Sequence, residues 1–349
     1  MVHPIRETTD MESLNIVFTG ENQLEVRRET VSPLQSGQVL VEGKKSLIST
    51  GTECICLARN FAAGTHWDNW VKYPFYAGYS HTGMVVEVGE GVSNFKVGDL
   101  VAARAGHRQF FVANASQLLP LRTDVAYEHA AWFALASIVQ NGVRRAQLEL
   151  GDTVVIIGVG LLGQLAVQYA RLSGAREVIA IDTPASTARL EMAKAHGATH
   201  TLAMSADEAK AAVSEITKGR LADVVFDVTG HPAVFPAALG LARRFGKLLL
   251  LGDAGRPSQQ CLTSDVMTRG VRIIGAHDND APATESDYHY WTRDNMSQLF
   301  FDYVARGQMR IEDLISHRFS PENAREAYNL LLNDRTSAMG VIFDWSQVK

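Results

Sequence analysis

Short apolar runs separated by glycine turns dominate the first third of the chain. We expect strands at residues 24–28, 39–45, 82–89 and 100–104, because each run is rich in residues that favour strands. Ser36-Gly37 and Gly98-Asp99 are typical turn sequences between them. This density of strands and turns predicts a compact, partly barrel-like β unit.

The pattern changes twice further along. It becomes helical at residues 128–138 and 141–147. From Gly151 onward, apolar strands at 154–157, 177–181, 223–227, 247–251 and 271–274 alternate with helices that begin near residues 163, 188, 232 and 265. Such alternation predicts a parallel sheet with helices on both faces. Helices at 293–306 and 321–333 and a strand at 339–343 complete the chain. We therefore expect a parallel-sheet domain, 142–285, inserted into a β-rich domain, 11–141 and 286–349.

The first strand of the parallel sheet runs into a glycine-rich turn. Gly158, Gly160 and Gly163 have the G-x-G-x-x-G spacing, which gives a tight turn, close approach of a pyrophosphate and close helix packing. The helix after the turn begins at Leu161 and Leu162 and directs free N–H groups at the phosphate. The sequence therefore predicts a dinucleotide site; the alternative is an ordinary strand–helix turn without a ligand.

Further residues at the same edge of the sheet favour NAD. Asp182 ends the second strand, where an acid accepts hydrogen bonds from the ribose hydroxyls and repels a 2′-phosphate. Arg189 could stack on the adenine or bind that phosphate. Other candidates follow later strands of the sheet: Thr229, Gly230, Gly252, Asp253 and His277. His277 could reach the nicotinamide side or a partner subunit.

Composition excludes several other functions. A net charge of −5 over 349 residues argues against a protein that binds nucleic acid or anionic membranes. Three cysteines are too few for a disulfide framework. The N-terminus lacks an apolar signal core, and no apolar run reaches the length of a membrane span. We expect a cytoplasmic protein that binds a small-molecule substrate.

Four segments carry a resemblance to a known family: GYSHTGMVVEVGEGVSNFKVGDLV at 78–101, GDTVVIIGVGLLG at 151–163, DVVFDVTG at 223–230 and GKLLLLGDAG at 246–255. They resemble the medium-chain dehydrogenase/reductase family. The resemblance implies an α/β protein with a GroES-like β-rich catalytic domain, a Rossmann domain and an active site in the cleft between them. It also implies a homodimer or homotetramer joined through the edges of the Rossmann sheets.

The zinc positions of that family are changed in this chain. Thr50 stands at the position of the catalytic cysteine, Tyr79 at that of the histidine, and Ala134 aligns best with the third ligand. None of these is a normal zinc ligand. The segment after Val101, where the family has a four-cysteine structural zinc lobe, contains no cysteine. We expect no metal, although a displaced site from Glu53, His81 and the cysteines at 54 and 56 stays open.

Two zinc-free branches of the family are relevant. The segment 47–53, Leu-Ile-Ser-Thr-Gly-Thr-Glu, resembles that of dehydrogenases of hydroxyethyl bacteriochlorophyllide, which oxidise an alcohol. Together with Asp182, it favours an NAD-dependent enzyme that interconverts a secondary alcohol and a ketone. One alternative is an NADPH-dependent enoyl or quinone reductase; another is a dinucleotide-binding protein without catalytic activity.

Without zinc, side chains must remove the hydroxyl proton and hold the substrate oxygen. Thr52 stands at the family's proton-relay position, and Thr50 and Tyr79 should face the cleft. The remaining catalytic candidates are Glu53, which could orient a base or begin a helix, His81, which shares the face of Tyr79 by strand alternation, and His107, a natural general base. Aromatic residues between 67 and 76 suit a cyclic or aromatic-sized substrate, such as a sugar, a cyclitol or a secondary metabolite.

Overall fold

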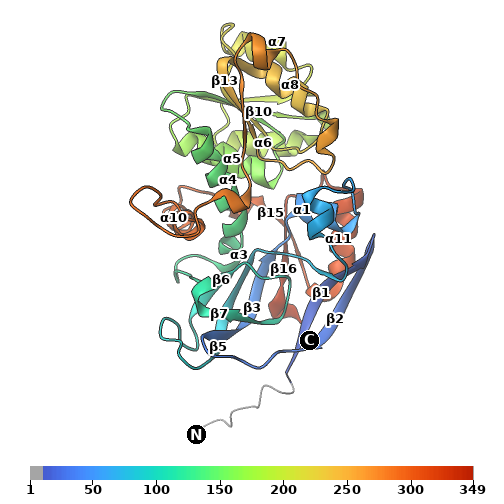
Figure 1. The fold of residues 1–349 in the computed structure, drawn as a ribbon, viewed down its shortest axis with the longest axis vertical. Helices are drawn as coiled ribbons and strands as arrows, with labels where there is room; N and C mark the ends of the chain where they lie inside the picture. Colours follow the sequence, from blue (N-terminus) through green and yellow to red (C-terminus); the bar gives the residue numbers. More distant parts are fainter. Residues whose placement is uncertain (1–10, 349) are drawn as a thin grey trace. The chain divides into compact units, whose positions relative to one another are not determined.

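A computed structural model describes residues 11–348 of the chain. The N-terminal segment predicted to lack a signal core lies almost wholly outside the described residues. The described residues divide into two compact units (Figure 1). The β-rich unit comprises residues up to 60, 70–134 and from 298 on, and the α/β unit comprises 61–69 and 135–297.

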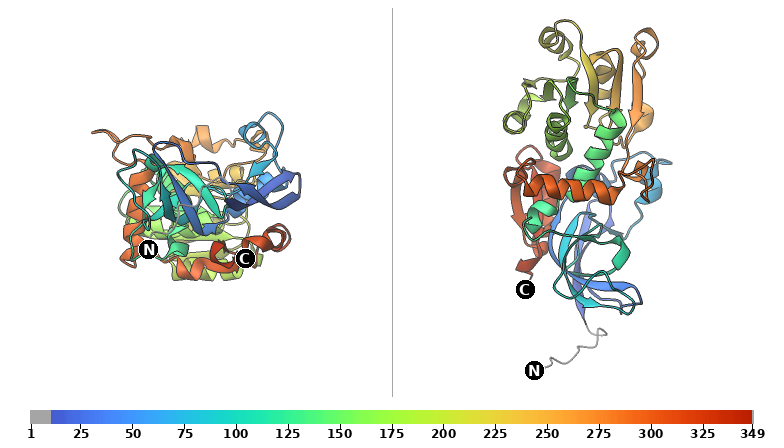
Figure 2. Two further views of the ribbon diagram at one scale, coloured as in Figure 1. Left: turned by 90° about the horizontal axis from the view of Figure 1, so that it is seen from below. Right: turned by 90° about the vertical axis from the view of Figure 1, so that its left-hand side faces the viewer.

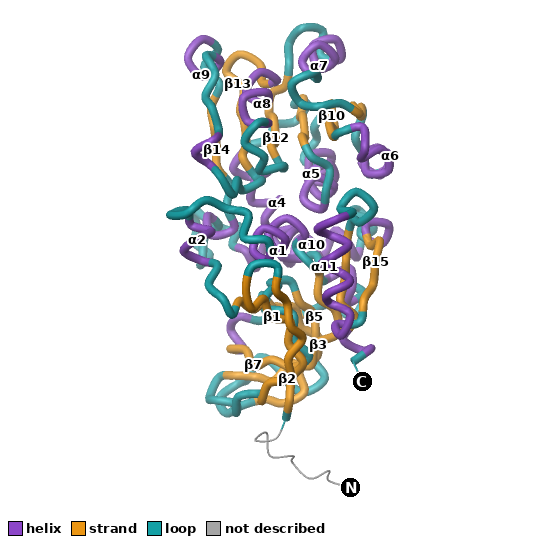
Figure 3. The backbone as a smooth tube through the Cα atoms, turned by 90° about the vertical axis from the view of Figure 1, so that its right-hand side faces the viewer, coloured by secondary structure: helices purple, strands orange, loops and turns teal. Residues whose placement is uncertain are grey.

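Mostly antiparallel strands build the β-rich unit; β15 and β16 form its parallel pair within residues 11–348. One sheet has the order β2-β1-β4, and a larger one has the order β15-β16-β3-β5-β6-β8, with β7 paired to β3. Its helix α1 packs against α11 (Figure 3). The elements are β1 (Glu12–Gly20), β2 (Gln23–Thr30), β3 (Gln38–Leu47), α1 (Thr50–Leu57), β4 (Phe75–Tyr76), β5 (His81–Val88), β6 (Leu100–Ala103), β7 (Phe110–Asn114), β8 (Leu119–Pro120), α3 (Tyr127–Ala130), β15 (Ile315–Phe319), α11 (Ala324–Asn333) and β16 (Gly340–Asp344).

The α/β unit is a six-stranded parallel sheet of order β11-β10-β9-β12-β13-β14, with helices flanking the strands (Figure 2). The strand order reverses between β9 and β12. Such folds bind dinucleotides at the carboxyl ends of the strands, next to this switch point. The elements are β9 (Thr153–Ile157), α5 (Leu161–Leu172), β10 (Glu177–Asp182), α6 (Thr187–Ala195), β11 (His200–Ala203), α7 (Lys210–Ile216), β12 (Ala222–Asp227), α8 (Val234–Leu241), β13 (Ala242–Leu250), α9 (Asp265–Thr268) and β14 (Arg272–Gly275). Helices α2 (His66–Trp70), α4 (Phe133–Ala146) and α10 (Arg293–Ala305) cross the unit boundaries.

The expected fold class is confirmed: the chain has a GroES-like β-rich domain with mostly antiparallel strands and a doubly wound parallel sheet. The unit boundaries fall at 134/135 and 297/298, where the sequence suggested 141/142 and 285/286. Residues 61–69 were expected in the β-rich domain, yet they belong to the α/β unit. None of the helices within 11–348 is long and apolar enough to cross a bilayer.

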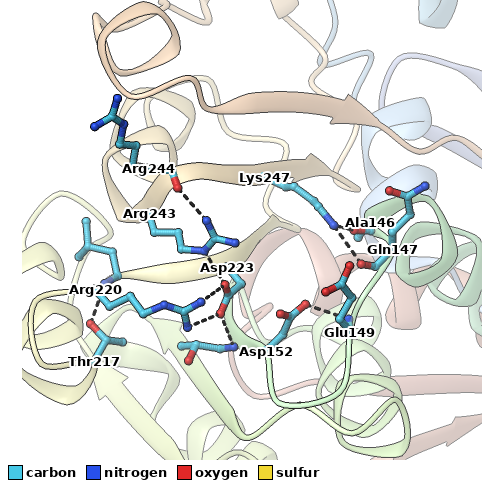
Figure 4. Close-up of polar contacts among 12 residues, drawn as sticks. Ala146, Gln147, Glu149, Asp152, Thr217, Arg220, Asp223, Arg243, Arg244 and Lys247 are labelled. Atoms are coloured by element: carbon cyan, nitrogen blue, oxygen red, sulfur yellow. Dashed lines mark hydrogen bonds and ion pairs between the residues drawn. The ribbon is translucent and has the colours of Figure 1, made fainter.

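Charged groups close the amino edge of the parallel sheet (Figure 4). The buried carboxylate of Asp223 accepts hydrogen bonds from Thr153 N–H at 2.9 Å, Arg220 at 2.8 Å and Arg243 at 2.5 Å. Burial would raise the pKa of Asp223, but these hydrogen bonds and the arginine charges outweigh it and lower the pKa. Lys247 donates to the carbonyl oxygens of Ala146 and Gln147, which cap the end of α4. This edge is therefore fixed by ion pairs, and the opposite edge is left for ligands.

Candidate functional site

The glycine turn after β9 has the geometry that a pyrophosphate requires. Gly158 has a φ of +90°, and its N–H donates to Ile181 O at 2.8 Å. A Cβ atom on Gly163 would lie 2.1 Å from Gly158 O, so only glycine lets α5 begin so close to β9. A Cβ on Gly160 would have no neighbour closer than 4.0 Å, which leaves its backbone open to a ligand. These residues fit a dinucleotide at the start of α5.

The carboxylate of Asp182 accepts hydrogen bonds from the backbone of this turn and from its own chain neighbour. Its Oδ2 accepts from Val159 N–H at 2.9 Å and its Oδ1 from Thr183 N–H at 2.8 Å. The carboxylate at the end of β10 therefore stands beside the phosphate-binding turn, where a ribose would lie. The guanidinium of Arg189 lies beside Gly160, 4.0 Å from the ideal Cβ position, so it could contact a phosphate or the adenine.

Two more turns meet at the carboxyl edge. Gly252 lies against Gly230, since a Cβ on Gly252 would be 2.4 Å from Gly230 N. Thr229 is held by Asp227, whose Oδ1 accepts from Thr229 N–H at 3.0 Å and from its hydroxyl at 2.7 Å. Burial raises the pKa of Asp227 despite these hydrogen bonds. Asp227 was not among the predicted site residues, although its place at the end of β12 was a usable signal.

The zinc positions all lie in the β-rich unit. Thr50 is the first residue of α1, Tyr79 precedes β5, and Ala134 is fully buried in α4. A hydroxyl, a phenol and a methyl group do not fit a zinc ion. Nor do Glu53, His81, Cys54 and Cys56 form a ligand group: within 11–348, the group of three close ligand-type side chains is His66, Asp253 and His277. Burial raises the pKa of Cys54 to about 12, so this thiol stays protonated.

A buried carboxylate organises the β-rich unit next to these positions. Glu53, 1% exposed, accepts from Ser49 N–H at 2.7 Å, from His107 Nε2 at 3.0 Å and from the Tyr328 hydroxyl. Burial and the charge of Glu53 hold the pKa of Tyr328 well above its usual value, so the phenol stays protonated and donates. Glu53 therefore ties α1, the segment after β6 and α11 together.

The other side of His107 is also occupied. Its Nδ1 lies 2.7 Å from Ser46 Oγ, which itself accepts from Trp345 Nε1 at 2.9 Å. The hydroxyl proton of Ser46 is thereby directed at Nδ1, and the imidazole proton sits on Nε2 facing Glu53. With no exposed ring atom and both nitrogens engaged, His107 does not have the geometry of the general base that the sequence suggested. It positions Glu53 instead.

His81 is a core residue. Both of its ring nitrogens lie against backbone carbonyl oxygens, those of Thr82 at 3.1 Å and Arg108 at 3.0 Å. Burial, together with the nearby His107, lowers its pKa to about 3, so the ring is neutral. The expectation that it shares a face with Tyr79 fails, because β5 begins at His81 and Tyr79 lies before the strand.

The half-buried Tyr79 donates from its hydroxyl to Ser49 Oγ at 2.6 Å. Ser49 is the residue before α1, and Thr50 and Thr52 occupy the first turn of that helix. The Ser-Thr-Gly-Thr segment thus brings three hydroxyl side chains to the start of α1, and Tyr79 hydrogen-bonds the first of them. Among the aromatic residues expected to line a substrate site, Phe75 packs on Phe18 at 6.1 Å between ring centres.

Two family descriptions match the chain: "alcohol dehydrogenase GroES-like domain" over residues 35–121 and "zinc-binding dehydrogenase" over residues 162–290. The fold and the dinucleotide turn define the class, a two-domain oxidoreductase. The chain belongs to the medium-chain dehydrogenase/reductase family.

Similar proteins of known name are dehydrogenases. L-threonine 3-dehydrogenase of Bacillus subtilis is 28% identical over 76% of this chain and 82% of its own length. D-guloside 3-dehydrogenase of Escherichia coli is 27% identical over 77% and 78%. The structure of galactitol-1-phosphate dehydrogenase from Escherichia coli has a TM-score of 0.79 at 22% identity and covers 96% of this chain and all of its own. Similar structures hold NADP in one case and NADH in another. These relatives support an oxidoreductase that acts between an alcohol and a ketone.

Proposed function

We propose that the protein is an NAD-dependent dehydrogenase that interconverts a secondary alcohol and a ketone without zinc at the family's catalytic position. The substrate is of the size of a sugar, a cyclitol or a secondary metabolite. When bound, NAD supplies the oxidant, because its nicotinamide ring accepts the carbinol hydrogen with its electron pair. The protein is cytoplasmic and forms a homodimer or homotetramer.

The observation that carries the proposal is Asp182, bound through both carboxylate oxygens to the backbone around the glycine turn. A carboxylate held there accepts hydrogen bonds from two ribose hydroxyls and repels a 2′-phosphate. A guanidinium of Arg189 that pairs with the 2′-phosphate would instead favour NADP. Gly158, Gly160 and Gly163 bind the pyrophosphate, with the N–H groups of Leu161 and Leu162 at the helix start. At the later strand ends, Thr229, Gly230, Gly252, Asp253 and His277 contact the nicotinamide half.

In the β-rich unit, hydroxyl groups bind the substrate oxygen in place of a metal ion. We assign the contact with the substrate oxygen to Tyr79, with Thr50 and Thr52 as further polar contacts. Glu53 and His107 position this group, because Glu53 fixes the backbone of Ser49, whose side chain accepts from Tyr79. Hydrogen bonds from hydroxyls polarise a carbonyl oxygen less than a metal does, so a separate proton acceptor is required.

The test uses the purified full chain. We expect calorimetry to show tighter binding of NAD than of NADP, elemental analysis to show no stoichiometric zinc in active protein, and NADH to form with at least one member of a panel of sugars, polyols and hydroxy acids. Gly163→Ala should abolish NAD binding, because its Cβ would lie 2.1 Å from Gly158 O. Gly240→Ala is the matched control, since its Cβ meets nothing within 4 Å.

Three results would contradict the proposal in different ways. Stoichiometric zinc in active protein would refute the metal claim. A strong preference for NADPH with reduction of an enone would favour the reductase alternative. NAD binding without turnover on the panel would favour a dinucleotide-binding protein that has lost catalysis.

A further inference from the structure

Residues 61–69 carry a histidine to the ligand edge of the parallel sheet. In sequence they lie between α1 and β4 of the β-rich unit, yet they pack on the α/β unit. Ala62 N–H donates to Gly255 O at 2.8 Å, which anchors the segment beyond the end of β13. His66, the first residue of α2, thereby reaches the turn that follows β13.

At that turn His66 meets two residues from the ends of adjacent strands. His66 Nε2 lies 2.8 Å from Oδ2 of Asp253, which follows β13. The ring of His277, which follows β14, is edge-on to the ring of His66, with 5.9 Å between centres and 79° between planes. The ligand-type atoms of all three side chains lie within 4.8 Å of one another. The His66 and Asp253 side chains are 52% and 37% exposed, so they are open to a small molecule.

Two features favour proton transfer over metal binding at this cluster. Ligand atoms around a tetrahedral zinc ion lie about 3.3 Å apart, from bonds of about 2.0–2.1 Å, whereas 2.8 Å is a hydrogen bond. His277 Nδ1 accepts from Asn279 N–H at 3.2 Å, so its proton sits on Nε2. A metal-bound histidine does the reverse, donating its second N–H to an acceptor.

The location fits the nicotinamide half of the cofactor. The glycine turn and Asp182 lie at the ends of β9 and β10, on one side of the switch point, and take the pyrophosphate and the adenosine ribose. The ends of β13 and β14 lie on the other side, where the second half of a dinucleotide extends. Asp253 and His277 end those strands, and His66 joins them from segment 61–69.

We propose that His66 is the catalytic base that takes the proton of the substrate hydroxyl, with Asp253 as its positioning residue and His277 as a hydrogen-bond donor beside it. The proposal rests on the proposed function and supplies its missing proton acceptor. The hydrogen bond to Asp253 holds the His66 proton on Nε2 and leaves the Nδ1 lone pair as the basic site. Within 11–348, the polar contact of the His66 side chain is the one from Nε2 to Asp253.

The step balances. The O–H bond of the alcohol breaks, its proton passes to His66 Nδ1, and the oxygen electron pair forms the C=O bond. The carbinol hydrogen leaves with its electron pair to the oxidised nicotinamide, and the imidazolium formed on His66 is stabilised by the Asp253 carboxylate. Burial raises the pKa of Asp253, although the charges of His66 and His277 oppose that rise. In the reverse direction the imidazolium protonates the ketone oxygen.

The first test is chemical rescue. His66→Gly should lower kcat/KM for NAD-dependent alcohol oxidation by about 10²- to 10⁴-fold, and added imidazole should restore part of kcat. Asp253→Asn should lower kcat with little change in KM, and imidazole should not restore it. The control is His200→Gln. His200 also pairs with a carboxylate, Glu177, at 3.3 Å, but at the starts of their strands on the opposite edge of the sheet.

The second test needs no turnover. Diethyl pyrocarbonate should modify His66 in the wild-type protein, NAD should protect it, and His200 should be modified equally with and without NAD. Calorimetry should give NAD affinities within about twofold of wild type for His66→Gly, which separates catalysis from binding.

The outcomes distinguish this inference from the proposed function. An active wild type whose His66→Gly variant keeps full activity, or a His66 that NAD does not protect, would overturn the catalytic base and leave the dehydrogenase standing. A stoichiometric metal ion, required for activity and lost in His66→Gly, would overturn it in favour of a metal site. A wild type inactive across the whole substrate panel would overturn both.

Discussion

Replacing Glu53 should destabilise the β-rich unit more than any surface change. The side chain is 1% exposed and accepts three hydrogen bonds, from Ser49 N–H, His107 Nε2–H and the Tyr328 hydroxyl. In Glu53→Ala these three buried donors lose their acceptor. Breaking a buried charged group in this way costs about 3–5 kcal/mol. Glu53→Gln keeps one carbonyl oxygen but turns an amide N–H₂ toward a donor, and we expect a loss of about 2–3 kcal/mol.

The assay must be local, because a chain of two units need not unfold in one transition. Hydrogen exchange followed by mass spectrometry of a peptide spanning residues 46–57 reports on the Ser49 amide, which donates to Glu53. A loss of 2–3 kcal/mol predicts exchange about 30- to 140-fold faster in Glu53→Gln, since each 1.4 kcal/mol is tenfold. Glu87→Gln, a half-buried position in β5 of the same unit, is the control.

A Glu53→Gln variant in which the peptide spanning residues 46–57 exchanges as slowly as in the wild type would refute this reasoning. A change below about 0.5 kcal/mol is what an ordinary surface substitution produces. Such a result would mean that the three donors find water or other acceptors when the carboxylate is removed, and that Glu53 does not hold the segment before α1.

Three further changes test other parts of the molecule. Asp182→Ser should improve the ratio of NADP to NAD affinity about tenfold, because it removes a charge that repels the 2′-phosphate; calorimetry with both nucleotides measures this. Stability should fall as the pH drops from 6.5 toward about 3, since unfolded His81 takes a proton that the folded ring, with its pKa lowered to about 3, refuses; the fall in urea midpoint should be smaller in His81→Gln. Ile273→Lys in the edge strand β14, combined with Met267→Lys in the preceding helix α9, should reduce the oligomer measured by light scattering, whereas Val97→Lys, exposed on the β-rich unit, should not.

The parallel sheet was predictable because its inner strands are buried on both faces. Residues 154–157 are all apolar, and residues 223–227 are an apolar stretch with an aspartate at each end. The structure has strands at both places. Strand β1 was missed for a physical reason. Its buried stretch includes Ser13 and Asn15, which hydrogen-bond each other at 2.9 Å, so the run reads as neither alternating nor apolar. Strand β11, a short half-buried edge strand, left little apolar signal.

Site residues that belong to one local motif could be predicted, whereas those brought together by tertiary contacts could not. Gly158, Gly160, Gly163 and Asp182 could be found from spacing alone, because their chemistry is local to one strand–helix–strand unit. The network around Glu53 could not be found, because Tyr328, which donates to Glu53, and Trp345, which donates to Ser46, come from the far end of the chain and carry no local motif. The approach of His66 to Asp253 is likewise a tertiary contact between segments far apart in sequence.

The buried network around Glu53 extends to Tyr79, which stands where the family resemblance places a zinc ligand. Its hydroxyl is held by Ser49, whose backbone N–H is held by Glu53. Its chain neighbour Gly78 has a φ of +89°, and a Cβ there would lie 2.8 Å from three atoms of the His107 ring, so the backbone before Tyr79 rests on that imidazole. Glu53 and His107 therefore fix Tyr79 from both ends. A phenol positioned by a rigid buried network can hold a substrate oxygen where its family has a metal, since pre-organised donors need no reorganisation when charge develops.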